Sequence, residues 1–449
     1  MSRELKNSGI PWIGDIPKGW SAKKLKFSCK LFGRIGFRGY TADDLVDESE
    51  GAITLSPTNM SGIKLDYSKC SYLSWDKYYE SPEIMVNVGD VLLVKTASVG
   101  KCSYVDYLPK ETTVNPQILV LKEHKDCSKF IAYFFQTSVG EAYIDTTKGG
   151  STIYTISQEK IGNYEFVFPS LEEQHKIASF LDRKCAEIDE MIALQEKIVE
   201  ELKAYKQSVI TEAVTKGLNP DAPMKDSGIE WVDSIPLSWK VAKIKNVISL
   251  LTDYDANGSF ADIASNVKVN LGIPYAWMVR ATDLANQRYG LVDGNNYCDI
   301  STFNYLKKSV VHSGDILIAK RGEIGKVYLV PNVDCPMTLA PNTYLLKLRQ
   351  RVIDNRYFHY FLTSEMGRMQ LVLNNKSTAI GAIYKDDVKS ISILLPSLRE
   401  QQDIANHLDT KCTEIDNLIS IKLSKIDSLK EYKKSIIYEY VTGKKEVIE

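Results

Sequence analysis

Two stretches of the chain carry a regular spacing of apolar side chains. Residues 170–215 repeat such side chains at alternating steps of four and three, and residues 397–449 begin in the same way but drift after Leu418 to a broader apolar stripe. This spacing gives a helix one apolar edge and is typical of a coiled-coil seam. The sequence therefore predicts two long helices, with polar interruptions of the seam at Lys184, Gln195 and Lys411. The residues predicted to pack between helices are Ile177, Leu181, Ile188, Met191, Ile198, Leu202, Ile404, Leu408, Ile415, Leu418, Ile426 and Leu429.

The starts of both stretches carry the same helix-start signal. Ser170 precedes Glu173 by three residues, and Ser397 precedes Glu400 in the same way. In such a capping box the hydroxyl accepts from the amide of the third helical residue, and the carboxylate accepts from the cap amide. The connector 216–223 ends the first helix, because it contains glycine and two prolines.

The rest of the chain is a duplication. Residues 6–20 return as residues 225–239, and residues 88–95 return as residues 313–320. The two helix starts match as well, and the separation between matching positions widens only slightly along the chain. A repeat on this scale indicates one structural unit used twice, with small loop insertions.

Each half predicts the same series of short elements. Apolar runs at 90–95 and 315–320, at 117–122 and 343–348, and at 164–169 and 391–396 read as strands. Aromatic residues at helical spacing predict helices at 129–144 and 356–373, with the aromatic rings in the core. The predicted fold class is α+β, with two strand-rich domains that are each followed by a long helix. The predicted boundaries are 1–169, 170–216, 217–396 and 397–449.

Composition places the chain among ordinary globular proteins. Its 449 residues exceed what one core usually holds. Hydrophobic residues make up 44% and charged residues 25%, and no run approaches the ~18 apolar residues of a membrane span. The first residues lack the apolar segment and cleavage pattern of a signal peptide. We therefore expect a cytoplasmic protein.

Charge and cysteine spacing exclude two further classes. A formal net charge of -1 argues against a protein that coats nucleic acid by bulk electrostatics, so any DNA contact must come from local basic loops or from a larger assembly. The eight cysteines contain no C-x-x-C pair and no zinc-like spacing with the five histidines. We expect reduced thiols and no metal site.

Common enzyme motifs are missing from the sequence. The Gly-Lys pairs at 100–101 and 325–326 lack the other residues of a phosphate-binding loop, and no H-E-x-x-H, G-x-S-x-G or dinucleotide-binding glycine pattern occurs. Residues 253–258 begin like a calcium loop, but position twelve is Ala264 where glutamate is needed. No Asn/Asp-Pro-Pro-aromatic tetrapeptide of an amino-methyltransferase is present. The sequence therefore predicts no catalytic residue in this chain.

The remaining candidates are polar and cationic residues on loops at matching places in both halves. Arginine, lysine, asparagine, serine and threonine are the side chains that hold DNA phosphates and read base edges. We expect Arg280 to contact a base or a phosphate, Asn257 to contact a base edge, and the lysines at the Gly-Lys turns to contact phosphates. The full set of candidates is Ser56, Thr58, Asn59, Lys95, Lys101, Lys148, Ser151, Thr152, Asn257, Arg280, Thr282, Lys320, Arg321, Lys326, Lys376, Ser377 and Thr378.

The duplicated plan resembles the specificity subunit (HsdS type) of a type I restriction–modification system. Three pairs of segments carry the resemblance over essentially the whole length. They are the Ser-Gly-Ile-x-Trp…Ile-Pro-x-x-Trp openings, the Gly-Asp-(Val/Ile)-Leu…Gly-Lys segments, and the Pro-Ser-Leu-x-Glu-Gln…Leu-Asp-x-Lys-Cys-x-Glu-Ile-Asp helix starts at 169–189 and 396–416. The halves align poorly at 30–85 and 249–310, so base-reading residues there do not follow from the resemblance.

The resemblance implies a role in DNA recognition. Each globular half would be a target-recognition domain that reads one part of an asymmetric bipartite site on double-stranded DNA. The two helices would form an antiparallel coiled coil, and two copies of an adenine-N6 methyltransferase subunit would bind around them, with a motor-nuclease subunit as an optional partner. The chain itself would hold no cofactor, and S-adenosylmethionine would belong to the methyltransferase.

Other readings of the same residues stay open. The long helices can instead present two domains to protein ligands, which would make the chain a coiled-coil adaptor that reads no DNA sequence. Nuclease or methyltransferase activity of the chain alone has no motif in its support. The cationic turns favour DNA.

Overall fold

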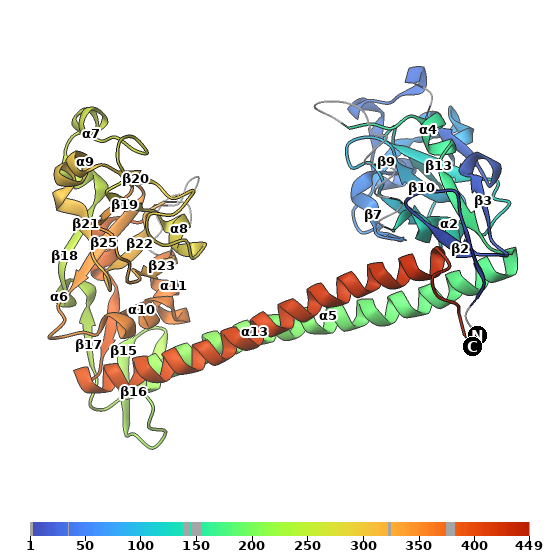
Figure 1. The fold of residues 1–449 in the computed structure, drawn as a ribbon. Coiled ribbons are helices and arrows are strands. Elements are labelled where there is room, and N and C mark those ends of the chain that lie inside the picture. Colours follow the sequence, from blue (N-terminus) through green and yellow to red (C-terminus); the bar gives the residue numbers. More distant parts are fainter. Residues whose placement is uncertain are drawn as a thin grey trace. The chain divides into compact units, whose positions relative to one another are not determined.

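The computed structural model describes residues 3–34, 36–137, 140, 144, 154–321, 325–373 and 382–448. The chain divides into two compact units. Unit 1 is Met1–Glu196 with Leu423–Glu449, and unit 2 is Lys197–Lys422. Each unit therefore contains one globular half and one section of each long helix (Figure 1).

The two long helices are α5, Leu171–Lys216, and α13, Leu398–Val441. The hydroxyl half of each predicted cap is present, because the amide of Glu173 donates to Ser170 Oγ and that of Glu400 to Ser397 Oγ, both at 3.3 Å. The carboxylates make tertiary contacts. Glu173 pairs with Arg3 at 2.7 Å, and Glu400 accepts from the indole of Trp239 at 2.9 Å. Each cap thus ties its helix to the opening of its own unit.

The seam between the helices follows a heptad that differs from the predicted one at alternate positions. In α5 it passes through Cys185 and Ile192 and not through Lys184 and Met191, whose side chain is 43% exposed. In α13 it passes through Cys412 and Ile419, whereas Leu418 is 46% exposed. Met191 and Leu418 were therefore wrongly placed in the seam. An α-helix has 3.6 residues per turn, so two neighbouring positions near the same edge can both be apolar in the sequence. Packing decides which of the two lies in the seam.

The same six side chains open the seam in both helices. In unit 1 α5 buries or half-buries Gln174, Ala178, Leu181, Cys185, Ile188 and Ile192, and in unit 2 α13 does so with Gln401, Ala405, Leu408, Cys412, Ile415 and Ile419. The other predicted packing residues, Ile177, Ile404 and Ile426, are buried, and Ile198, Leu202 and Leu429 are half-buried.

Ion pairs accompany the seam at matching positions. In unit 1 Lys433 Nζ lies 2.6 Å from Asp189, and in unit 2 Lys206 Nζ lies 2.6 Å from Asp416. In unit 1 Phe180, nearer the start of α5, packs on Tyr440, nearer the end of α13, with ring centroids 4.5 Å apart. The helices therefore run antiparallel, which confirms the predicted coiled coil (Figure 1).

Unit 1 is built from short strands and small helices. Its elements before α5 are β1 Leu5–Asn7, β2 Asp15–Pro17, β3 Ser21–Lys24, β4 Lys30–Gly33, β5 Leu45–Val46, β6 Gly51–Leu55, β7 Met60–Ser61, β8 Lys64–Leu65, β9 Ser71–Ser74, α1 Trp75–Tyr79, β10 Val91–Val94, β11 Cys102–Tyr104, β12 Thr112–Val114, β13 Ile118–Lys122, α2 Ser128–Phe135, α4 Gln158–Gly162 and β14 Glu165–Phe168.

Unit 2 repeats most of this series. Its elements between α5 and α13 are β15 Met224–Ile229, β16 Val232–Pro236, β17 Lys240–Lys243, α6 Ile244–Val247, β18 Ile248–Asp253, α7 Phe260–Asn266, β19 Ala276–Val279, α8 Ala281–Ala285, β20 Tyr297–Cys298, α9 Ile300–Tyr305, β21 Val310–Val311, β22 Ile316–Ala319, β23 Val327–Leu329, β24 Met337–Leu339, β25 Thr343–Leu348, α10 Asn355–Thr363, α11 Glu365–Leu373, α12 Lys385–Ser390 and β26 Ser392–Leu395.

One sheet is the same in both units and the other is not. The order β11-β10-β13-β4 in unit 1 matches β23-β22-β25-β18 in unit 2. The second sheets, β12-β6-β9-β5 and β20-β19-β24-β21, share three strands, because β6 and β19 each pair in parallel with β12 or β24 and antiparallel with β9 or β20. They differ in the fourth strand, which is β5 on β9 in unit 1 and β21 on β24 in unit 2. The divergent strands lie in the stretches where the two halves align poorly. The common sheet is thus a shared scaffold, and the second sheet carries the differences.

The predicted strands and aromatic core are present, with two corrections. Phe130, Phe134, Tyr357 and Phe361 are at most 1% exposed. The helix predicted at 129–144 is shorter, because α2 ends at Phe135. The helix predicted at 356–373 is two helices, because Ser364 is extended and starts the second one. Its hydroxyl accepts from the amide of Gly367 at 3.3 Å and so supplies a new cap.

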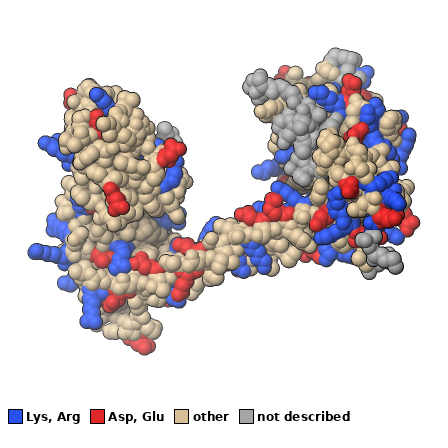
Figure 2. Space-filling view, in the orientation of Figure 1, with Lys and Arg blue, Asp and Glu red and all other residues tan. Residues whose placement is uncertain are grey.

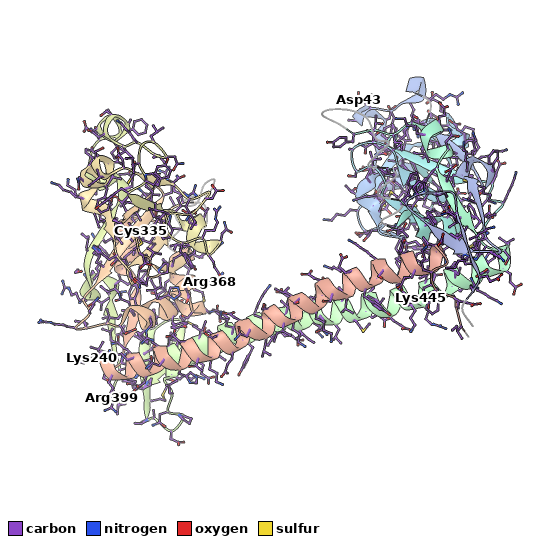
Figure 3. All side chains as sticks on the ribbon, viewed as in Figure 1. Asp43, Lys240, Cys335, Arg368, Arg399 and Lys445 are labelled. Carbon is purple, nitrogen blue, oxygen red and sulfur yellow. The ribbon has the colours of Figure 1, made fainter. Side chains whose placement is uncertain are left out.

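The end of α13 packs against the opening of unit 1. Ile436, Ile437 and Val441 share a core with Trp20. Past the helix, Lys444 Nζ donates to the carbonyl of Ile13 at 3.0 Å. Lys445 pairs with Glu439 at 2.8 Å (Figure 3).

Candidate nucleic-acid interface

A tight turn follows the parallel strand of the second sheet in each unit. In unit 1 it holds Ser56, Thr58 and Asn59 after β6, and in unit 2 it holds Arg280, Thr282 and Asp283 after β19. The strand registers make the two turns correspond, since Ile53 lies opposite Thr112 and Trp277 opposite Met337. Both turns close with a capping box. The side chain of Asn59 accepts from the backbone amide of Ser56, and the side chain of Asp283 accepts from the backbone amide of Arg280. The scaffold is shared, and the side chains that it carries differ.

Asn59 is a structural residue of the unit 1 turn. It is 4% exposed, and its amide nitrogen donates to the carbonyls of Asp66 and Lys69 at 3.0 and 2.9 Å. Its oxygen accepts from the amide of Ser56 at 3.0 Å. These bonds use the groups that would read an adenine edge. Ser56 is half-buried, and Thr58 at the tip of the turn is exposed.

Arg280 is fixed by the buried carboxylate of Asp283. Nε lies 3.0 Å from Oδ2, and Nη2 lies 2.7 Å from Oδ1 and 2.8 Å from the carbonyl of Gly294. Nη1 donates to Asn296 at 3.3 Å. The hydrogen bond to Asp283 raises the pKa of Arg280 above its ordinary value. The neighbouring Thr282 is exposed.

The side-chain amide of Asn257 is also hydrogen-bonded within its own unit. Nδ2 donates to the carbonyl of Tyr254 at 3.0 Å and to Ser309 Oγ at 2.8 Å, and Oδ1 accepts from the amide of Lys308 at 3.1 Å. These bonds hold the loop after β18 against the loop before β21. A base contact by Asn257 would have to replace them.

The Gly-Lys turns connect β10 to β11 and β22 to β23. Lys95 and Lys320 follow the first strand of each pair, and Lys101 and Lys326 precede the second. Lys101 is exposed, and its Nζ lies 3.4 Å from the carbonyl of Pro57, which brings the Gly-Lys turn and the strand-end turn of unit 1 together. In unit 2 α8 packs against β22 and β23. Two of the predicted loops therefore meet in unit 1, and in unit 2 the strand-end turn leads into a helix that lies against the two strands joined by the Gly-Lys turn.

The third predicted loop of each half lies outside the described residues. Lys148, Ser151, Thr152, Lys376, Ser377 and Thr378 belong to it. The described residues that follow it adjoin the Gly-Lys turns, because Thr155 bridges to Thr96 and Ala382 bridges to Arg321. Arg321 is exposed there, as is Lys326 across the turn.

Lys320 in unit 2 is part of an ionic cluster. Its Nζ lies 3.1 Å from Asp253 and 2.8 Å from Asp255, and Lys385 Nζ lies 2.9 Å from the other oxygen of Asp253. Burial works to lower the pKa of Lys320, but hydrogen bonds to the two carboxylates outweigh it, and the pKa is raised. Asp253 and Asp255, whose spacing resembles the start of a calcium loop, are therefore paired with lysines.

Lys95 in unit 1 corresponds to Lys320 but has different surroundings. Gly33 lies opposite Leu119 where Asp253 lies opposite Tyr344, and Gln158 opens α4 where Lys385 opens α12. A Cβ on Gly33 would lie 3.4 Å from Lys95 Nζ. Within the described part of unit 1 the ammonium of Lys95 has no carboxylate partner. Burial lowers the pKa of Lys95.

Sequence reasoning missed Arg288 and Lys385. Arg288 lies on the loop after α8, 3.5 Å from Asp283, and Lys385 completes the cluster around Asp253. Neither residue has a counterpart of its own type in unit 1, so self-comparison gave no signal for it. The sequence shows that Arg280, Asp283 and Arg288 lie close together along the chain. It does not show that both arginines contact the carboxylate of Asp283, because this contact depends on the turn after β19.

The surface charge is mixed over each unit. On the face drawn in Figure 2, Lys and Arg lie among Asp and Glu in both units. No group of three or more metal-ligating side chains occurs among the described residues. None of the helices in the described ranges is both long and apolar enough to cross a membrane.

Comparison with known proteins gives one consistent family. The model of the type I restriction modification DNA specificity domain matches residues 74–204 and 236–443. The type I restriction enzyme MjaVIII specificity subunit of Methanocaldococcus jannaschii is 26% identical over 370 residues, which cover 81% of this chain and 80% of that protein. The EcoKI specificity subunit of Escherichia coli K12 is 24% identical over 439 residues, covering 93% and 88%.

Solved structures share the fold. A chain from a study of complex assembly and conformational transition of the type I R-M system matches with a TM-score of 0.70 at 16% identity, covering 95% of this chain and 98% of that one. The HsdS subunit from Thermoanaerobacter tengcongensis matches with a TM-score of 0.52 at 15% identity, covering 95% and 98%. These matches confirm the predicted fold class and the resemblance that the duplicated motifs indicated. The chain belongs to the type I restriction modification DNA specificity domain family.

Proposed function

We propose that this chain reads an asymmetric bipartite DNA sequence, with one part contacted by each unit. One observation carries the proposal. The strand-end turn and the Gly-Lys turn lie on equivalent scaffolds in both units, yet they carry different side chains. Unit 1 has Ser56 and a lysine without a described carboxylate partner, and unit 2 has two arginines around Asp283 and a neutralised lysine. A shared frame with different polar side chains supports two readers of unlike sequences.

The proposed partners are two copies of an adenine-N6 methyltransferase subunit, with a motor-nuclease subunit as an optional addition. A net charge of -1 supports the need for partners, because tight DNA binding requires many phosphate contacts that this chain supplies only locally. The target adenine would be flipped and methylated by the partner, which would bind S-adenosylmethionine. We place this activity in the cytoplasm.

The chain is proposed to contribute no reacting group of its own. The polar side chains that the described loops bring together are mainly serine, threonine, lysine and arginine held by carboxylates or carbonyls, which is a set suited to binding and not to proton transfer. Purified chain alone should therefore show neither methyl transfer nor strand cleavage.

The test is selection of DNA by the complex. The full chain and its methyltransferase partner are mixed with a library of randomised duplexes, and bound DNA is sequenced at several salt concentrations. We expect two unlike sequence elements at a fixed separation, with affinity that falls steeply with salt. Binding that ignores sequence at every salt concentration would contradict DNA reading. Retained methyltransferase binding in that case would favour the coiled-coil adaptor.

A further inference from the structure

The loop after α8 in unit 2 holds two arginines around one buried carboxylate. Asp283 is 0% exposed at its side chain, whereas the side chains of Arg280 and Arg288 are 31% and 42% exposed. Trp277 Nε1 also approaches Asp283, at 3.4 Å. The group carries a net charge of about one positive unit, because one carboxylate offsets one of the two guanidinium ions.

Arg280 has almost no donor left for DNA. A guanidinium has five N–H donors, and those of Arg280 go to Asp283, to the carbonyl of Gly294 and to Asn296. A two-bond contact with a base would require leaving Asp283, which would strand a buried carboxylate. Arg280 is therefore a clamp that closes the loop 280–296 on itself.

Hydrogen bonds hold the backbone of Arg288, whereas its guanidinium makes one hydrogen bond among the described residues. Its single side-chain contact in the described region is Nη2 to Asp283 at 3.5 Å, and its Nε has no partner there. Its backbone is pinned on both sides, since its amide donates to the carbonyl of Asp283 at 2.9 Å and its carbonyl accepts from Asn295 at 3.0 Å. The guanidinium thus lies beside Asp283 with terminal donors to spare.

The loop leaves room for this guanidinium. Gly294 has a φ of +81°, and a Cβ there would come within 2.9 Å of Arg288 Nη1. Asn295 is 7% exposed and donates to the carbonyls of Arg288 and Gly290. Gly290 in turn faces Cys335, which Figure 3 labels. The end of the Arg288 side chain therefore lies directly beside the backbone of Gly294.

We infer that Arg288, and not Arg280, is the specificity-determining residue of this loop and that it contacts the O6 and N7 acceptors of a guanine, with Asp283 as its positioning residue. The inference rests on the proposed function. A planar guanidinium fixed by a carboxylate matches the paired acceptors of guanine, which is the commonest specific base contact of arginine. A phosphate contact would need no such fixed plane and would gain little from a group whose charge is half offset.

The experiment uses the full chain in complex with its methyltransferase partner and the same randomised-duplex selection. Arg288→Lys keeps the charge and removes the planar pair of donors. We expect preference for guanine at one position of one sequence element to fall about ten- to a hundredfold, with the other element unchanged. Arg351→Lys, at an exposed site in the turn after β25, is the matched control and should change neither element.

Three outcomes are distinguishable. Sequence elements that are identical for Arg288→Lys and the unaltered chain would overturn the inference. A uniform loss of affinity for all duplexes, with Arg288→Gln also lowering the salt dependence, would assign Arg288 to a phosphate and would equally overturn it. An unaltered complex that selects no sequence would instead contradict the proposed function. Thermal unfolding that is unchanged in Arg288→Lys would show that the loop still folds.

Discussion

At the scale of single residues, corresponding positions in the two units have different surroundings. Lys95 and Lys320 each follow the second strand of the common sheet, β10 or β22, yet Lys320 lies among Asp253, Asp255 and Lys385. In unit 1 Gly33 occupies the position that corresponds to Asp253. The same lysine is therefore paired with carboxylates in unit 2 and has no carboxylate partner among the described residues of unit 1.

This contrast predicts opposite effects for two alanine substitutions. Lys320→Ala leaves the largely buried Asp253 with one cation instead of two, so we expect a loss of about 1 kcal/mol in unfolding free energy after allowing for solvent screening. Lys95→Ala should change stability by less than about 0.5 kcal/mol. In DNA binding the order reverses, because Lys95 contacts a phosphate under the proposed function and Lys320 does not.

Thermal unfolding of the full chain and salt-dependent binding of the complex measure the two effects. The Lys95→Ala complex should bind more weakly to all sequences, with the salt slope reduced by about one. Equal stability losses for the two variants would refute the different roles. A reduced salt slope in Lys320→Ala would do the same.

Residue-level assignments were the least predictable part from sequence. The turns holding Ser56 and Arg280 were identified because they recur in both halves, and the exposure of Thr58 and Thr282 fits a loop-tip role. Whether a polar side chain is spent inside the protein depends on partners far along the chain, such as Ser309 for Asn257 and Gly294 for Arg280. Sequence spacing carries no information on such contacts.

At the scale of elements, the long helices were predictable in extent but not in register. Cap residues and the glycine-proline connector set the bounds of α5, which match the predicted range 170–216. The predicted range 397–449 is too long for α13, which begins at Leu398 and ends at Val441. The predicted seam lies one residue before the observed seam at alternate positions, because neighbouring residues such as Met191 and Ile192 are both apolar. Burial of Cys185 and Cys412, at 3% and 6% exposed, identifies the true line.

Two neighbouring substitutions in unit 1 test the register. Ile192 packs against the core of the unit, so Ile192→Ala should cost about 1 to 2 kcal/mol of unfolding free energy. Met191→Ala removes a side chain that is 43% exposed and should cost less than about 0.5 kcal/mol. Chemical denaturation of the full chain gives both values. A larger loss from Met191→Ala would restore the originally predicted seam.

Element boundaries failed where local caps compete with apolar periodicity. The stretch 356–373 reads as one amphipathic helix, and the structure breaks it at Ser364. Serine accepts the amide of Gly367 and thereby starts a new helix, while Gly367 allows close approach to the backbone of Phe361 and Leu362. The aromatic pattern determined burial correctly but not continuity.

At the scale of the whole molecule, the duplication was the strongest sequence signal, and the structure contains it in detail. Tyr133 donates to Asp182 at 2.8 Å, and Tyr360 donates to Asp409 at 2.7 Å. Gln174 and Gln401 each accept from the amide that precedes the aromatic helix. Each unit therefore anchors the start of one long helix through the same contacts.

A matched heptad insertion tests whether the helices set the separation of the DNA elements. Seven residues added to α5 after Lys203 and seven added to α13 after Lys430 keep both seams in phase and lengthen each helix by ~10 Å. We expect the selected sequence elements to stay the same and their separation to change by about three base pairs. Altered elements with an unchanged separation would contradict a spacer role for the helices.

The most direct test of sequence reading is a map of methylated adenines. Genomic DNA lacking the modification is treated with the full chain, its methyltransferase partner and S-adenosylmethionine, and N6-methyladenine is located by sequencing. We expect methylation at one bipartite sequence with two unlike elements and no methylation when this chain is omitted. Methylated adenines that share no common sequence, or an unchanged pattern without this chain, would contradict it.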